Sequence, residues 1–439
     1  MSKVFRPYEP EQILLMPVCL QEWLPPDHLA YFISDVVDHM DLGAIMGRYE
    51  AEERGYPPYH PRMMVKVLLY AYCVGVPSSR KVEKRLKEDI AFRVLSANNT
   101  PDFKTIADFR KDHLQALAGL FLQVLKLCQK AGLVKLGHVS LDGTKVRANA
   151  SKHKAMSYGR MKEEEQRLEA EVRELLKQAQ EVDEEEDRRY GKGKRGDEIP
   201  QELAFRESRL RKIREAKAAL EVEAREATER ARVEGKGHPE LPEDKAQRNF
   251  TDPESRIMPA PGGKDFIQGY NAQAAVDSAH QVIVACDVTN RPSDKGQAGP
   301  VMEQAKHNTG QLPREVSADA GYFSVKAVTE ITGLGVEAFI PPNKVRHTVP
   351  LAAAPRGRIP KDLSLIDRMR RKLRTQRGKK SYALRMKTVE PVLGQIKQGR
   401  GFRQLLLRGL RKAKGEWQLI CTGHNLLKLF RVWKPALVA

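Results

Sequence analysis

Apolar positions in the first 130 residues recur three and four apart, which is the pattern of helices with one buried face. In HPRMMVKVLLYAYCVGV, a stripe through Met64, Val67 and Leu68 ends at a Gly-Val-Pro-Ser-Ser turn. The next segment, SRKVEKRLKEDIAFRVL, resumes the helical pattern with basic residues on its polar side. A third helix should begin after Thr100, which we expect to be its cap, with Pro101 in the first turn.

A helix, a tight turn and a basic helix suggest a DNA-binding unit of the helix-turn-helix type. A plain helical bundle would give the same pattern, so both interpretations stay open. In either case we expect residues 1–130 to form an all-helical N-terminal domain.

Residues 160–233 contain two charged segments whose apolar positions alternate four and three apart, as in a coiled coil. The stripe positions are Leu168, Val172, Leu175, Ala179, Val182, Leu210, Ile213, Leu220, Ala224 and Ala227, with Lys217 as a polar interruption. The stretch YGKGKRGDEIP between the segments can reverse the chain. We predict an antiparallel helical hairpin, inserted as a structural arm. Residues 234–264, rich in Gly, Pro and charge, predict a long loop.

Short apolar runs bounded by turn residues indicate strands in the remaining sequence. They are GHVSLDG, YNAQAAVDSAH, QVIVACDVTN, REVSADAGYF and VEAFIPPN, of which the second and third should form a hairpin. A helix should run from about Thr388 to Leu410, and GEWQLICTGHNLLKLFRVW should add a short strand and a helix. About five strands among helices predict an α/β fold with a mixed sheet.

Positive charge is concentrated in one segment of the chain. The whole protein has a formal net charge of +19, and residues 344–414 alone contain 22 Lys and Arg against three acids. Apolar residues are interleaved with these cations, which is unlike a disordered charge run and favours a folded basic surface. A basic surface of this size predicts a polyanionic partner, and nucleic acid is the commonest one.

Several classes of protein are disfavoured by the composition. The N-terminus has no apolar signal core, and no run approaches the roughly 18 apolar residues of a membrane span. The five cysteines lie far apart without metal-ligand spacing, which predicts free thiols in a reducing compartment. We expect a cytoplasmic, nucleoid-associated protein with no membrane partner.

Three isolated acids suggest the chemistry. Asp142 ends an apolar run and is followed by a glycine, which by itself would indicate an ordinary Asp-Gly turn. Asp319 repeats the pattern in SADAGYF, and Glu390 is the only Glu among the cations of the basic segment. Three carboxylates set against positive charge suit two Mg²⁺ or Mn²⁺ ions acting on a phosphodiester. Lys145, Arg147 and Lys152 follow Asp142 and would hold phosphates.

Five motifs carry a resemblance to a known family: SLDGTKVRANASKHKAMSYGRM, NFTDPESRIM, GYNAQAAVD, SADAGYFS and TVEPVLGQIKQGRGFRQLLLRG. They resemble bacterial insertion-sequence transposases of the DDE type, and SSRKVEKRLKEDIAFRVLSANNTPDFKTIADFRKDH resembles the N-terminal domain of that family. The resemblance extends from about residue 10 to residue 432.

The resemblance implies a ribonuclease H-like catalytic domain over residues 131–432, interrupted by the hairpin and the loop. In this fold the first Asp lies on the first strand, the second Asp follows the fourth strand, and the Glu lies on a later helix. Asp142, Asp319 and Glu390 match these places and would be both the catalytic residues and the ligands of Mg²⁺ or Mn²⁺, with two ions expected.

The family also has a signature of Tyr, Arg, Glu and then Lys seven positions later, which Tyr382, Arg385, Glu390 and Lys397 match in order. Four residues separate the Arg from the Glu here, whereas the related pattern usually has three, so Lys387 is an alternative to Arg385. Glu390 and Lys397 should share one helix face. The residues expected to contact DNA are Lys145, Arg147, Lys152, Tyr382, Arg385, Lys397, Arg400 and Arg403. His153 is an alternative base or ligand, but phosphate contact or packing is favoured.

The resemblance implies a DNA transposase that cleaves at the ends of its element and joins the 3′-OH to target DNA. Its partners would be the terminal inverted repeats and the target, bound as double-stranded DNA by a homodimer. A metal-dependent nuclease without strand transfer has the same triad and is one alternative. An inactive DNA-binding relic is another, although all three acids are present.

Overall fold

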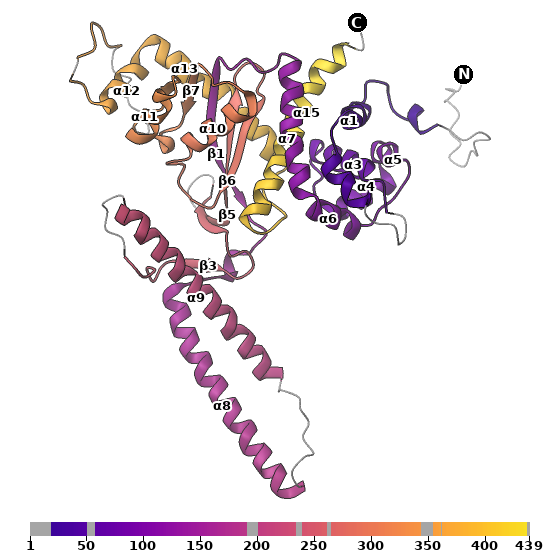
Figure 1. Cartoon of the computed structure of the whole chain (residues 1–439), viewed down its shortest axis with the longest axis vertical. Helices are drawn as coiled ribbons and strands as arrows, with labels where there is room; N and C mark the ends of the chain where they lie inside the picture. Colours follow the sequence, from indigo (N-terminus) through magenta and orange to yellow (C-terminus); the bar gives the residue numbers. More distant parts are fainter. Residues whose placement is uncertain are drawn as a thin grey trace, which may run out of the picture. The chain divides into compact units, whose positions relative to one another are not determined.

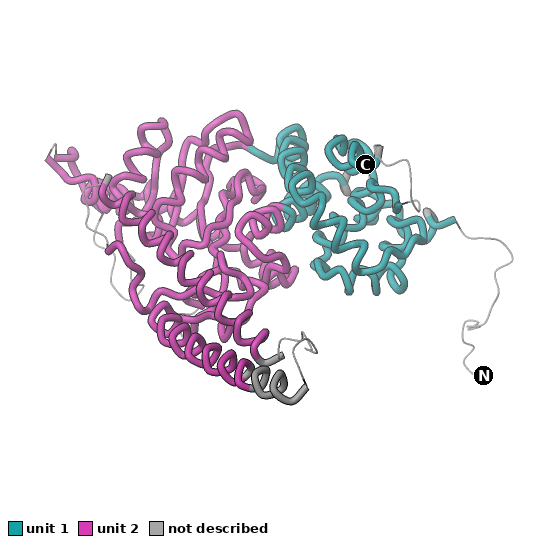
Figure 2. Tube along the Cα trace, turned by 60° about the horizontal axis from the view of Figure 1, so that its bottom comes forward, with its two compact units in different colours: residues 1–134, 419–439 teal, residues 135–418 magenta. Residues whose placement is uncertain are grey.

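The computed structural model describes residues 19–50, 58–190, 201–233, 239–260, 265–343, 354–360 and 362–436. The chain divides into two units, residues 1–134 with 419–439 and residues 135–418 (Figure 2). Parts of three predicted features lie outside the described residues: the turn at 191–200, the loop ends 234–238 and 261–264, and residues 344–353 of the basic segment. The domain boundaries inferred from the sequence stay a prediction.

The first unit is helical (Figure 1). Its helices are α1 (Leu29–Asp38), α2 (Gly43–Glu50), α3 (Pro61–Cys73), α4 (Ser79–Glu88), α5 (Ile90–Ser96), α6 (Phe103–Asp112), α7 (Leu114–Lys130) and the last part of α15 (Leu410–Ala436). The predicted stripe on α3 is buried, including Val67 and Leu68. The predicted cap at Thr100 is wrong, because Asp102 supplies the oxygen: it accepts a hydrogen bond from Thr105 N at 2.7 Å.

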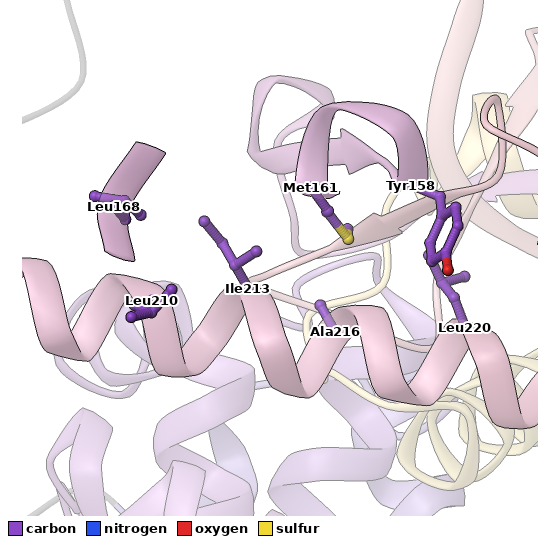
Figure 3. Close-up of a cluster of buried hydrophobic side chains, with 7 residues drawn as sticks. All are labelled: Tyr158, Met161, Leu168, Leu210, Ile213, Ala216 and Leu220. Atoms are coloured by element: carbon purple, nitrogen blue, oxygen red, sulfur yellow. The ribbon is translucent and has the colours of Figure 1, made fainter. Parts of the chain in front are cut away.

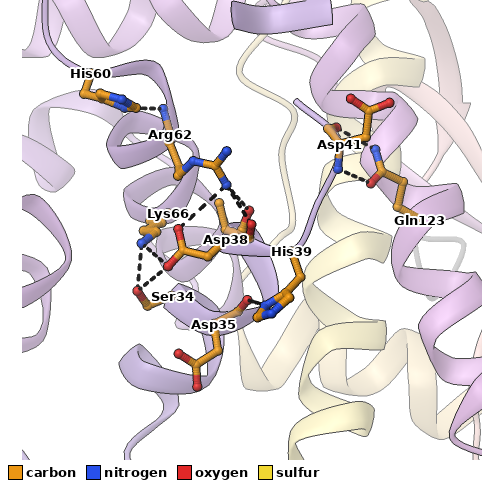
Figure 4. Close-up of polar contacts among 10 residues, drawn as sticks. Ser34, Asp35, Asp38, His39, Asp41, His60, Arg62, Lys66 and Gln123 are labelled. Carbon is orange, nitrogen blue, oxygen red and sulfur yellow. Dashed lines mark hydrogen bonds and ion pairs between the residues drawn. The ribbon is translucent and has the colours of Figure 1, made fainter. Parts of the chain in front are cut away.

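Basic side chains of α3 stabilise the end of α1 (Figure 4). Arg62 donates to the carbonyl oxygens of Val37 and Asp38, each at 3.0 Å, and Lys66 Nζ lies 2.7 Å from Asp38 Oδ2. Carbonyls at a helix C-terminus have no partners within the helix and carry partial negative charge, so cations are favourable there. These two cations are therefore committed to packing within the first unit.

The second unit is built on a mixed sheet with the strand order β4-β5-β1-β7-β8, in which β6 also pairs with β5. Its strands are β1 (His138–Arg147), β4 (Arg256–Pro259), β5 (Phe266–Asp277), β6 (Ile283–Thr289), β7 (Glu315–Ala318) and β8 (Glu337–Phe339). β1 is antiparallel to β5, which is antiparallel to β6, whereas β1, β7 and β8 are parallel. The five predicted strands are confirmed, and the order and directions are those of the ribonuclease H-like fold.

Helices pack against the strands of the sheet. They are α10 (Ala298–Thr309) on β5 and β6, α11 (Val325–Gly333) on β8, α12 (Leu365–Arg374) on β8, α13 (Gln376–Lys387) on β1, β7 and β8, and α14 (Val389–Gly394) on β1 and β5. Tyr270, Tyr322 and Phe339 are among the large side chains buried completely in this core. In the described part of the chain, no helix combines the length and apolar character that a membrane span requires.

Two predictions about the C-terminal segment are wrong. The helix expected from Thr388 to Leu410 ends at Gly394, and a π-helical turn (Gln395–Gly399) follows it. Gly401, with φ at +77°, then leads the chain into an irregular segment, a conformation that glycine adopts without strain. The strand expected around Trp417 is instead part of α15. Its apolar residues there are buried on all sides, and a short apolar run of that kind does not distinguish strand from helix.

The predicted hairpin is confirmed as two long helices, α8 (Tyr158–Tyr190) and α9 (Gln201–Val233), which pack side by side (Figure 1). Figure 3 shows the apolar residues between them, among which Leu168, Leu210 and Ile213 belong to the predicted stripe. Lys217, the interruption in the stripe, donates from Nζ to Glu165 Oε2 at 2.6 Å. A carboxylate on the facing helix therefore compensates the cation within the seam.

Short strands join the arm to the sheet. β2 (Ala155–Ser157) pairs antiparallel with β3 (Gln247–Asn249), directly before α8 and after α9. The loop predicted at 234–264 is therefore wrong over β3 and β4, because β3 pairs with β2, which is distant in sequence, and β4 pairs with the next strand, β5. This pairing keeps the two ends of the insertion together and allows β1 and β5 to remain adjacent.

Candidate active site

The register of the sheet brings Asp142 and Asp319 together. β1 and β7 run parallel with Leu141 opposite Ala318, so the residue after each of these two is one of the acids. Asp319 begins a 3₁₀ turn, and its Oδ1 accepts a hydrogen bond from Gly321 N at 2.8 Å. The two lone acids therefore meet where β7 ends beside the middle of β1.

Glu390 reaches the same place through an arginine. Arg385 Nη1 lies 3.2 Å from Asp142 Oδ2, and its Nη2 lies 2.8 Å from Glu390 Oε1. Arg385 comes from α13, and Glu390 is the second residue of α14. One guanidinium thus bridges two of the three predicted catalytic acids. Lys387, the alternative to Arg385, is exposed, and its carbonyl accepts a hydrogen bond from Gln281.

Burial and neighbouring charges act on the Asp142 carboxyl in opposite directions. Burial raises the pKa of Asp142 to about 7, with a smaller contribution from Asp319, while Arg385 opposes the rise. The side chain is 18% exposed. Although burial lowers the pKa of Arg385, the charges of Asp142 and Glu390 raise it above its ordinary value. Burial, more than the neighbouring negative charge, therefore disfavours the ionised form of Asp142, and Arg385 compensates this only in part.

Lys397 contacts β1 but not from the predicted helix. Its Nζ donates to Thr144 Oγ1 at 2.9 Å and to the Lys145 carbonyl at 3.1 Å. Glu390 and Lys397 were expected on one α-helical face, and this is wrong because Lys397 belongs to the π-helical turn that follows α14. π-helical turns are rare and often occur at functional sites.

Two further residues of the predicted set, Tyr382 and Arg403, lie against Arg385 and Lys397. The ring centroid of Tyr382 lies 5.9 Å from the Arg385 guanidinium carbon. Arg403 donates to the Lys397 carbonyl at 3.4 Å, and its own carbonyl accepts from Arg147 N at 3.1 Å. The exposed end of β1 and the segment after the π-helical turn therefore lie side by side.

Of the remaining predicted residues, Arg400 packs on an aromatic ring, and Lys152 and His153 lie far from the acids along the sheet. The Arg400 guanidinium packs over the Phe402 ring at 5.2 Å. Lys152 and His153 belong to an exposed turn, and Lys152 Nζ lies 3.3 Å from Asp265 Oδ1, just before β5. Asp142 instead pairs with Ala274, toward the other end of β5. At about 3.3 Å per residue, the distance along β5 from Asp265 to Ala274 is roughly 30 Å. Lys152 and His153 are therefore not part of the acid cluster.

Asp294 is a fourth acid at the site that the sequence analysis missed. It follows β6, and its Oδ1 accepts from Asn271 Nδ2 at 2.7 Å and from Gln273 Nε2 at 2.8 Å. Lys145 Nζ lies 3.6 Å from the same oxygen. In the sequence it stands in RPSDKG, where Pro, Ser, Asp and Gly indicate only a turn. An isolated acid soon after a predicted strand was the one available signal.

The donors at this site suit a divalent cation in their chemistry. Asp142, Asp319, Glu390 and Asp294 offer carboxylate oxygens, which are the hard ligands that Mg²⁺ and Mn²⁺ prefer. The carboxylates of Asp142 and Glu390 already bind a cationic group, Arg385. Within the described ranges, no three His, Cys, Asp or Glu side chains are arranged as a set that would hold a metal ion. An ion held by Asp142 and Glu390 would therefore take the place of the guanidinium.

Comparison with known proteins gives two matches to family models. Residues 18–112 match a transposase domain (DUF772), and residues 359–430 match a transposase DDE domain. The second match includes Arg385, Glu390 and Lys397 and excludes the two aspartates of the sheet. No curated protein and no solved structure matches the chain.

Proposed function

Because the chain belongs to the insertion-sequence transposases of the DDE type, we propose that it cleaves DNA at the ends of a mobile element and joins the freed 3′-OH to target DNA. In the first reaction a water oxygen bonds to phosphorus, the bond to the 3′ oxygen breaks, and that oxygen takes a proton. In the second reaction the 3′ oxygen bonds to a target phosphorus and displaces another 3′ oxygen. Neither reaction requires a covalent bond to the protein.

The observation that carries this proposal is the bridge from Arg385 to Asp142 and Glu390, next to Asp319 in the parallel register. We assign Asp142, Asp319 and Glu390 as the residues that would hold Mg²⁺ or Mn²⁺, two ions in all. When bound, the ions would supply the charge that activates the attacking oxygen and stabilises the leaving one. Arg385, which here holds Asp142 and Glu390, would be free to contact a DNA phosphate when these carboxylates hold the ions.

Most of the remaining basic residues are assigned to the DNA backbone. Arg147 and Lys152 follow one another at the end of β1 and beyond it, so they suit phosphates at increasing distance from the cut. Lys145, whose Nζ is buried beside Asp294, is not assigned to a phosphate. Tyr382, Lys397, Arg400 and Arg403 contact the strand next to the cleavage point. Lys397 holds the β1 backbone and is therefore assigned a positioning role as well.

The helical region 1–130 is assigned to recognition of the terminal inverted repeats, as part of a homodimer on chromosomal DNA in the nucleoid. Its helix α4 exposes several basic residues and packs on α5 and α6. The exposed cations are Arg80, Lys81, Lys84, Arg85 and Lys87. Three of them pair with acids of the same segment, which leaves Arg80 and Lys81 as the strongest candidates for phosphate contact.

The test uses Asp142→Asn, Asp319→Asn and Glu390→Gln, which keep the side-chain shape and remove one charge each. Each variant should lose cleavage of an end-containing duplex and strand transfer from pre-cut ends, while its DNA affinity is unchanged or higher. Asp287→Asn is a matched control, because Asp287 lies on β6 and pairs with Lys414 outside the site. A variant that cuts at the wild-type rate would remove that acid from the site. Cleavage without strand transfer by the wild type would identify a nuclease instead.

A further inference from the structure

Each of the two sheet aspartates is followed closely by a glycine, and Asp294 lies near both glycines. A Cβ built on Gly143 would lie 2.6 Å from Gln273 Nε2 and closer still to Asp294 Oδ1, distances that real Cβ atoms essentially never adopt. A Cβ on Gly321 would lie 2.9 Å from Asp319 Oδ1, which is too close, and 3.5 Å from Asp294 Oδ2, which is an ordinary contact. The carboxylate of Asp294 therefore occupies the space that a side chain at position 143 would need, and it also lies in contact distance of position 321.

The two faces of β1 carry different parts of the site. Asp142 and Thr144 contact Arg385 and Lys397, whereas Lys145 contacts Asp294. This division follows from strand geometry, since successive side chains point to opposite faces of a sheet. Asp294 thus supports the site from the face opposite to Arg385.

A chain of hydrogen bonds runs from Asp294 to the turn that carries Asp319. Asp294 Oδ1 accepts from the Gln273 amide, and Gln273 Oε1 accepts from the Tyr322 hydroxyl. Tyr322 is completely buried and ends the 3₁₀ turn that Asp319 begins. A change at Asp294 therefore acts on Asp319 through fixed, buried groups.

An unpartnered polar atom points into the same space. Asn271 is completely buried, and in the part of the chain that the structure describes its Oδ1 has no hydrogen-bond partner. This oxygen would lie 3.0 Å from a Cβ on Gly143, so it is directed at the residue next to Asp142. A buried acceptor without a partner is costly, and a ligand that donates a hydrogen bond, such as a hydrated cation, would satisfy it.

We propose that Asp294 is a positioning residue of the reaction, which fixes the turn of Asp319 and adds a fourth negative charge for the divalent cation. The inference rests on the proposed function, because Asp319 is assigned there as a metal ligand. Groups that orient metal ligands from outside the ligand set typically change metal affinity or activity about 10- to 100-fold when they are removed. A fourth charge on the face opposite to Arg385 also balances Lys145.

The experiment measures Mn²⁺ binding without DNA by electron paramagnetic resonance, together with the Mn²⁺ concentration that gives half-maximal cleavage. Asp294→Asn keeps the shape and removes the charge, and Asp294→Ala also removes the acceptor oxygens. Both should weaken Mn²⁺ binding and raise the Mn²⁺ requirement about tenfold or more, with Ala the larger effect and the KM for DNA unchanged. Asp287→Asn should behave as the wild type in both measurements.

Wild-type Mn²⁺ affinity in both Asp294 variants would overturn the inference, as would a loss of DNA affinity without a loss of Mn²⁺ affinity. Lys145 loses its partner in these variants, which could prevent folding. In that case the proteins with Asp and with Asn at position 294 are compared in a Lys145→Met background. The same decrease in Mn²⁺ affinity is expected there. The two proposals fail differently. If Asp142→Asn still binds Mn²⁺ and cleaves DNA, the proposed function is wrong. If Asp142→Asn loses both properties and the Asp294 variants keep both, only the role proposed for Asp294 is wrong.

Discussion

The raised pKa of Asp142 predicts that Asp142→Asn stabilises the protein at alkaline pH when no metal is present. In the folded chain this pKa is about 7 instead of 3.8. Each pKa unit corresponds to about 1.4 kcal/mol, so keeping Asp142 ionised in the folded state costs about 4 kcal/mol of unfolding free energy above pH 7. Asparagine resembles the protonated carboxyl and does not carry this cost.

The sign follows from proton binding. Because the folded-state pKa is the higher one, the folded chain retains its proton between about pH 4 and pH 7, where the unfolded chain has lost it. The contribution of Asp142 to stability is therefore complete below about pH 4 and is lost as the pH rises through about 7. The variant should match the wild type near pH 4 and exceed it by up to about 4 kcal/mol at pH 8.5.

Urea unfolding in the presence of a chelator, at several pH values between 4 and 8.5, measures this difference. Asp287→Asn is the control, since its half-exposed pair with Lys414 should give a nearly constant difference across the range. Adding Mn²⁺ at pH 8.5 should stabilise the wild type more than Asp142→Asn. A difference that does not change with pH, or a variant less stable than the wild type at pH 8.5, would refute the reasoning.

Three further predictions concern other parts of the molecule. Ile213→Ala removes a side chain that is 1% exposed in the arm and should destabilise the arm by about 2–4 kcal/mol, seen as earlier thermal loss of helical circular dichroism with Mn²⁺ affinity unchanged. Burial lowers the pKa of His138 from 6.5, so stability should fall as the pH drops below about 6.5, and His138→Gln should reduce this loss in acid unfolding. The third change replaces three exposed lysines of α13 with glutamine, namely Lys379, Lys380 and Lys387. It should make the slope of log DNA affinity against log salt concentration less steep by about 2–3. An unchanged slope would mean that the phosphate contacts lie elsewhere.

The strands and the two sheet aspartates were predictable because their signals are local. An apolar run that ends in an acid and a small residue is visible in the sequence, and Asp142 and Asp319 both have it. The meeting of Asp142 with Glu390 is not local, because it depends on α13 and α14 packing against β1. The resemblance to the family, and not the residue pattern, supplied that pairing.

The features that sequence reasoning missed depend on contacts between distant segments. Asp294 stands among turn-forming residues, and only tertiary packing brings it between Gly143 and Gly321. Lys217 interrupts the apolar stripe of α9, and its place there is explained by its hydrogen bond to Glu165 on α8. The short strand β3 has the sequence QRN, which carries no strand pattern, and it forms because its partner is held next to it.

The pairing of β2 with β3 at the base of the arm has a consequence for the order in which the chain folds during synthesis. β1 leaves the ribosome about 120 residues before its antiparallel partner β5, a delay of about 6–24 s at about 5–20 residues per second. During this time α8 and α9 can pair locally. The pairing of β2 with β3 then reduces the open loop between β1 and β5 to two short segments, residues 148–154 and 250–265. Since loop closure costs entropy that grows with length, the finished arm should speed the docking of β5. The arm would thus act as an internal folding aid, and its loss would lengthen the time for which β1, with Asp142, remains an unpaired strand edge.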